Sequence, residues 1–171
     1  MQNIEQLKRR ADRGDFMAMY ELAEIYYKGS ENLQKDLNEA TRLWQKSAKK
    51  GYACAQLKIG VCYVRGEGVK PNVKKAMKWY EKAAKGGNAV AMSNLSKGYL
   101  SGLGVKKNEN KAVEWMTKAT ELGDAHSQYG LALMYQTGSG VNKSDEKAFY
   151  WHKKAAGQGY EDAIKSLSDY E

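Results

Sequence analysis

Imidazole chemistry in this chain could come only from His126 and His152, the two histidines of the 171-residue sequence. A histidine that binds zinc or acts as a catalytic base usually lies close in the sequence to other functional residues, as in the HExxH motif. Neither histidine lies in such a motif, and the two fall in different predicted helices. We therefore expect a protein that is not an enzyme, with no catalytic residues, no metal and no cofactor. His126 is expected at a polar helix position or against a partner, and His152 in a packing role.

Thiol chemistry is limited to Cys54 and Cys62, which lie on one predicted helix. Eight residues of helix separate two side chains by about 12 Å along the axis, so these two cysteines cannot form a disulfide with each other. Two cysteines are also too few for a disulfide framework. We expect both to be small buried apolar residues.

Gly-x-Gly turns that begin at Gly66, Gly102 and Gly138 could suggest phosphate-binding loops. They repeat in register, however, and lack the preceding strand of a dinucleotide fingerprint. Backbone geometry explains them better, since glycine readily adopts turn conformations. Tryptophans also recur in register and are expected to form a packing ladder rather than a platform for stacking bases. They are Trp79, Trp115 and Trp151.

The formal net charge of +8 favours an acidic partner. Lysines are spread along the predicted second helices and the turns, which is typical of a solvated surface, with an acidic protein surface as the second interpretation. Nucleic acid is disfavoured because the lysines alternate with acids and not with exposed aromatic residues. The lysines are Lys70, Lys74, Lys75, Lys78, Lys82, Lys85, Lys106, Lys107, Lys111, Lys118, Lys143, Lys147, Lys153 and Lys154.

The elements that carry these residues repeat along the chain. Closing glycines at Gly51, Gly87, Gly123 and Gly159 are 36 residues apart, and a tyrosine and an alanine recur within each block. A period of this length indicates stacked supersecondary units instead of one globular core. The recurring residues are Tyr26, Tyr63, Tyr99 and Tyr135, with Ala40, Ala76, Ala112 and Ala148.

The residue pattern of each unit predicts two helices. In residues 52–87, apolar residues at helical spacing from Ala55 to Tyr63 give a first helix, helix A, which a glycine turn ends. Asn72 can cap a second helix, helix B, which runs until Gly86 and Gly87. We expect one domain built from a half-unit (2–14), repeats 15–51, 52–87, 88–123 and 124–159, and a half-unit (160–171), with about ten helices and no substantial sheet.

These residues resemble a known family. The pattern Ile59-Gly60-x-x-Tyr63-x-x-Gly66-x-Gly68-Val69, followed by Lys75-Ala76-x-x-Trp79-Tyr80-x-Lys82-Ala83, is similar to the Sel-1-like repeat, a relative of the tetratricopeptide repeat. The resemblance implies an all-α fold, a right-handed α-α superhelix (solenoid) of about four helix-pair repeats with half-repeat caps. It also implies a binding platform without a common catalytic residue set.

The related tetratricopeptide architecture implies where a partner would bind. Five positions of each helix A face its concave groove, and we call their counterparts here the helix A lane. In this chain the lane contains unusually many apolar residues, which are either buried by tight curling of the superhelix or available for binding. The partner-binding residues so expected are Tyr20, Glu24, Tyr27, Lys28, Leu57, Val61, Val64, Arg65, Lys97, Leu100, His126, Tyr129 and Leu133.

The sequence thus favours a noncatalytic scaffold or adaptor whose concave surface binds a protein, through an acidic or amphipathic segment of that partner. A narrower form of this hypothesis is an inhibitor or immunity-type protein that binds one target. The alternatives are an enzyme with an unrecognised groove site and a basic RNA-binding module. No apolar stretch is long enough to span a bilayer, and the N-terminal residues do not begin a signal peptide, so we expect a soluble cytoplasmic protein. The oligomeric state cannot be read from the sequence.

Overall fold

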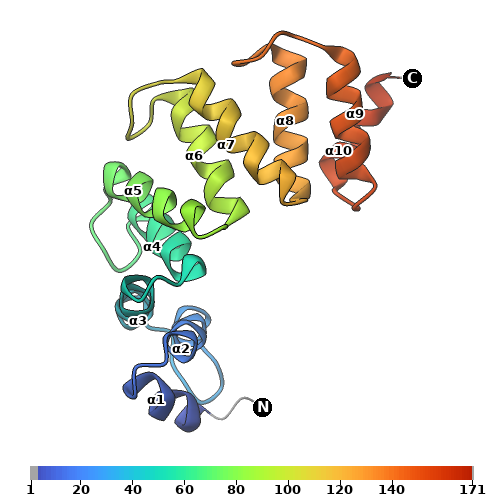
Figure 1. The fold of residues 1–171 in the computed structure, drawn as a ribbon. Coiled ribbons are helices and arrows are strands. Elements are labelled where there is room, and N and C mark those ends of the chain that lie inside the picture. Colours follow the sequence, from blue (N-terminus) through green and yellow to red (C-terminus); the bar gives the residue numbers. More distant parts are fainter. Residues whose placement is uncertain (1–3, 171) are drawn as a thin grey trace. The chain divides into compact units, whose positions relative to one another are not determined.

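A computed structural model of the chain describes residues 4–170 and confirms the predicted all-α repeat fold (Figure 1). Its described residues form ten α-helices and one 3-10 turn, with no strand beyond an isolated bridge between Ser30 and Leu33. The elements are α1 (Ile4–Asp12), α2 (Phe16–Lys28), α3 (Leu37–Lys49), α4 (Ala53–Arg65), α5 (Val73–Lys85), α6 (Ala89–Ser101), α7 (Glu109–Glu121), α8 (Ala125–Thr137), α9 (Asp145–Ala156), α10 (Glu161–Leu167) and η1 (Ser168–Tyr170).

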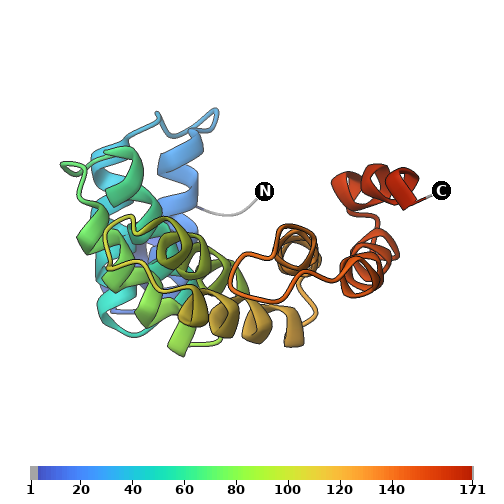
Figure 2. The ribbon, with the colours of Figure 1, turned by 90° about the horizontal axis from the view of Figure 1, so that it is seen from above.

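The chain divides into two compact units, Met1–Gly87 and Asn88–Glu171, which we call unit 1 and unit 2 and describe separately. Within each unit the helices pack in consecutive pairs. Helices α2 with α3 and α4 with α5 form the pairs of unit 1, whereas α6 with α7 and α8 with α9 form those of unit 2. The last helix, α10, lies beside α9 in both views of the ribbon (Figure 2).

Short polar side chains begin most of these helices. Asp15 accepts hydrogen bonds from the backbone N–H groups of Met17 and Ala18, which otherwise lack an intrahelical partner. Asn72 caps α5 in the same manner, as the sequence predicts, and Asn88 and Asp124 cap α6 and α8. The helix starts are therefore encoded locally.

Glycine turns join the two helices of a repeat. Gly66 and Gly68 have φ angles of 74° and 66°, in the left-handed region that favours glycine. A Cβ atom on Gly68 would lie 2.6 Å from the carbonyl oxygen of Leu37 and 2.4 Å from the Thr41 hydroxyl. Here the turn passes so close to α3 that no side chain fits, which confirms the interpretation of this turn as backbone geometry.

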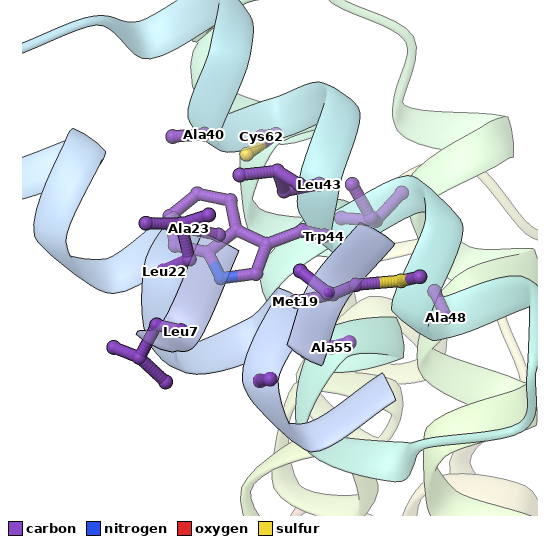
Figure 3. Close-up of a cluster of buried hydrophobic side chains, with 13 residues drawn as sticks. Leu7, Met19, Leu22, Ala23, Ala40, Leu43, Trp44, Ala48, Ala55 and Cys62 are labelled. Atoms are coloured by element: carbon purple, nitrogen blue, oxygen red, sulfur yellow. The ribbon is translucent and has the colours of Figure 1, made fainter. Parts of the chain in front are cut away.

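The interior of each unit contains a recurring pair of buried positions on helix B. Ala40, Ala76, Ala112 and Ala148 are fully buried, where the two helices of a repeat approach each other. A larger residue four positions later fills the space beside them, and Figure 3 shows Trp44 in this role among Leu22, Ala23 and Leu43. We call this second position the inner slot; its residues are Trp44, Tyr80, Met116 and His152, all buried.

Burial of His152 confirms the packing role expected for this residue. The recurring tyrosines and tryptophans, however, are less deeply buried than the inner-slot residues, since all of them remain half-buried. Lysines cover them: the ammonium groups of Lys82 and Lys118 lie 4.4 and 4.8 Å from the ring centroids of Trp79 and Trp115. Part of the exposed lysine surface thus stabilises the aromatic ladder.

The two cysteines differ in environment. Cys62 is buried, as expected, and burial raises the pKa of its thiol. Cys54 is only half-buried, so the expectation that both cysteines are core residues is wrong for Cys54. Its position near the start of α4 brings it beside Tyr52, away from the helix pair's interior.

Candidate functional site

The helix A lane lies on α2 and α4 in unit 1 and on α6 and α8 in unit 2. Every residue predicted to bind a partner is half-buried or exposed, and none is fully buried. Among the apolar ones, Val64 is 44% exposed and Leu133 is 37% exposed. These side chains are thus accessible to another molecule in each unit.

In unit 1, polar contacts connect the lane residues of α2 with α4 and the turn after it. The Lys58 ammonium lies 2.8 Å from a Glu24 carboxylate oxygen. The Tyr27 hydroxyl donates to a carboxylate oxygen of Glu67 at 3.5 Å, and Arg65 lies 3.8 Å from the same carboxylate. Glu24 and Tyr27 are consequently held by intramolecular partners, while Lys28 and Arg65 remain exposed.

Aromatic rings gather where α2 and α4 begin. The ring of Tyr20 meets that of Tyr52 edge-on at 5.2 Å, and Phe16 lies 5.5 Å from Tyr52. Burial, together with the neighbouring Glu24 carboxylate, raises the pKa of Tyr20 to about 12, so its hydroxyl stays protonated and can donate. The sequence-based prediction missed Phe16 and Tyr52, because neither stands at one of the five helix A positions that define the lane.

In unit 2, α6 and α8 border an apolar pocket of about 200 Å³ that is open to solvent. Three of the residues predicted to bind a partner, Lys97, Leu100 and Leu133, line it together with Met116 from α7. Gly130 contributes to the pocket because it has no side chain; a Cβ atom there would lie 2.9 Å from the Met116 methyl carbon. The structure thus places a positive charge beside a pocket large enough for one aliphatic or aromatic side chain.

His126 joins neighbouring helices of unit 2 through both ring nitrogens. The Lys97 ammonium, which can only donate, lies 2.9 Å from Nε2, so this nitrogen is the acceptor. Nδ1 therefore carries the proton and donates to the Tyr160 hydroxyl at 2.8 Å. Tyr129, another lane residue, packs on the ring of Tyr160 at 5.2 Å. Tyr160 was not expected in the site, since it precedes the last helix.

Protonation of His126 would break this arrangement. Burial, and next the positive charge of Lys97, lower the pKa of His126 below its ordinary value of 6.5. The folded state thus binds fewer protons than the unfolded state near this pH, and stability is greatest above pH 6.5 and falls as pH falls through the lowered pKa.

We expect a His126→Gln variant to lose part of that pH dependence, because its amide does not titrate while it can still accept from Lys97. Chemical denaturation of both proteins between pH 8 and pH 5 measures the effect. An identical decline of stability in the two proteins would show that other groups cause it.

No metal site accompanies these residues. Within the described part of the chain, no three histidine, cysteine or acidic side chains gather closely enough to hold an ion. None of the described helices combines the length and the apolar character needed to cross a membrane.

Comparison with known proteins identifies the repeats. The family profile described as Sel1 repeat matches four segments, residues 16–52, 55–88, 89–124 and 125–160. A search of curated protein sequences gave no match to the chain.

Two of the solved structures similar to the chain are described as bacterial repeat proteins. A protective antigen of uropathogenic Escherichia coli strains with an SLR fold is 36% identical with a TM-score of 0.91; the match covers 96% of this chain and 35% of the antigen, so this chain spans about a third of that relative. A Sel1 repeat protein from Oxalobacter formigenes is 34% identical with a TM-score of 0.90, over 97% of this chain and 67% of the relative.

An immunity protein, Pa5087 from Pseudomonas aeruginosa, is more distant. It is 26% identical with a TM-score of 0.66, and the match covers 94% of this chain and 59% of the relative. Four matched repeats spanning most of the sequence, together with these structures, establish that the chain belongs to the Sel1 repeat family.

Proposed function

We propose that this chain is a noncatalytic scaffold that binds another protein through the helix A lane. The observation that carries the proposal is the pocket of unit 2, where Leu100 and Leu133 leave apolar surface accessible beside the exposed ammonium group of Lys97. Accessible apolar surface bordered by polar groups is typical of a protein-binding site.

The charges around the lane indicate the chemistry of the partner. Each unit exposes basic residues on its own part of the lane, Lys28 and Arg65 in unit 1 and Lys97 in unit 2, so a segment with acidic residues bound to either unit would meet complementary charge. In unit 2, the pocket between α6 and α8 would take one large apolar side chain of the segment bound there. An acidic, amphipathic segment, either a helix or an extended strand, has both features.

A narrower form of the proposal is an inhibitor or immunity-type protein that binds one target. The similarity to the P. aeruginosa immunity protein supports this form, because the match extends over nearly the whole chain. Both cysteines are free, which fits a reducing compartment. We therefore propose that the protein acts in the cytoplasm.

Photo-crosslinking tests which surface meets the partner. We expect benzoylphenylalanine at the lane positions of Val64 and Leu133 to crosslink a protein in cells of the native host. The matched control position is Leu122, which is 56% exposed at the end of α7 and lies outside the lane. Crosslinks from position 122 with none from positions 64 and 133 would refute the proposed surface.

A further inference from the structure

Unit 1 contains a second cavity, which lies outside the helix A lane. Helices α1, α2 and α3 border a space of about 200 Å³ that is open to solvent and that no lane residue lines. Leu43, Leu22 and Met19 border it on the apolar side. The rest of its border is mainly polar and includes Asp12, Glu39, Arg42 and Lys46.

The repeat register explains why no side chain of the protein fills this space. Position 43 of the first repeat corresponds to Trp79 of the second, since the helix B positions recur every 36 residues. Where the second repeat has Trp79 and Tyr80, the first has Leu43 and Trp44. Trp44 fills the inner slot and is 2% exposed, so only a leucine remains at the outer position, where the other repeats carry an indole.

The lysine that covers this indole in the other repeats is nevertheless present. Lys82, Lys118 and Lys154 lie 4.4, 4.8 and 5.3 Å from the ring centroids of their tryptophans. Lys46 occupies the same register position and lines the cavity. Among the described residues, no ring lies under its ammonium group and no carboxylate pairs with it. The first repeat thus keeps the cation of a cation–π pair without the ring.

We propose that this cavity is a binding site for a planar aromatic ring of indole size, whose face lies under Lys46. An enclosed apolar cavity of about 150 Å³ in another protein accommodates benzene, and the space here, about 200 Å³, open to solvent and lined largely by polar groups, has room for the larger indole. Asp12 supplies a carboxylate that can accept from a ring N–H at the polar border of the site, whereas the Glu39 carboxylate already accepts from the Arg42 guanidinium. The ring comes either from a free indole-type compound or from a tryptophan side chain of another protein.

The test is a titration of the full chain with 5-fluoroindole, followed by ¹⁹F NMR. We expect saturable binding that Leu43→Trp abolishes, because the introduced indole would occupy the cavity under Lys46. Lys46→Ala should weaken binding by about 2- to 30-fold, the range of a cation–π contact. The matched control is Lys82→Ala, which removes the equivalent lysine above the filled position at Trp79 and should leave binding unchanged.

Two further measurements complete the experiment. If Leu43→Trp does not fold, nuclear Overhauser effects from bound indole to Leu43 and Tyr26 of the unaltered protein locate the site. Titration with N-acetyltryptophanamide distinguishes the sources: binding similar to that of indole supports a tryptophan side chain, and binding of indole alone supports a free compound. Absence of saturable binding, or binding that Lys46→Ala and Lys82→Ala affect equally, would overturn the proposal.

Discussion

Replacement of Trp44 by alanine is expected to destabilise the protein by about 3 to 5 kcal/mol, the usual cost of removing a buried tryptophan side chain. The indole is 2% exposed and lies at the centre of the buried cluster of unit 1 (Figure 3). It also packs 5.3 Å from the ring of Tyr27, and Lys58 lies over it at 5.4 Å. Alanine would leave a cavity among α1, α2, α3 and α4.

Chemical denaturation followed by circular dichroism measures this loss. The matched control is Trp79→Ala, which removes the same side chain from a half-buried position. We expect a smaller loss there, since part of that indole already faces solvent and the lysine above it. Equal losses at the two positions would show that the inner slot is not the main packing site.

Gly68→Ala is expected to be the second most damaging change. A side chain at a φ of 66° costs about 1 to 2 kcal/mol, because the left-handed conformation is strained for residues other than glycine. Overpacking adds about 1 to 3 kcal/mol, since the new methyl group would lie 2.6 Å from the Leu37 carbonyl oxygen. Both effects together should lower the free energy of unfolding more than either does alone.

Gly123→Ala separates the two effects. Gly123 has a φ of 81°, and a Cβ atom there would have no neighbouring atom within 4 Å. Only the conformational strain applies, so we expect a loss of about 1 to 2 kcal/mol from this control. If both variants unfold at the same denaturant concentration, the close approach of the turn to α3 contributes nothing to stability.

Much of the fold could be predicted because its signals are local. The capping residues Asp15 and Asn72 and the glycine turns each act within a few positions of the chain, and their 36-residue recurrence reveals the repeat. The depth of adjacent aromatic residues could not be predicted in this way. Trp79 and Tyr80 are neighbours of similar apolar character, and which one is buried depends on how helix B is rotated against the neighbouring helices.

The candidate site could be predicted only in part. The register places Lys97, Leu100 and Leu133 on helix A, but the pocket they line also needs the missing side chain of Gly130 and the position of Met116. Such a space depends on contacts between helices distant in the sequence. Whether lane residues are buried or accessible depends on the same contacts, so the sequence left both possibilities open.

The affinity of a captured partner for lane variants tests the central proposal most directly. Leu133→Asp would place a charge at the pocket of unit 2, and we expect it to weaken binding about 30-fold or more, as loss of a central interface residue does. Leu122→Asp makes the same change outside the lane and should leave affinity nearly unchanged, provided circular dichroism shows both variants folded. Equal affinities of the two variants, or a loss confined to Leu122→Asp, would contradict binding through the helix A lane.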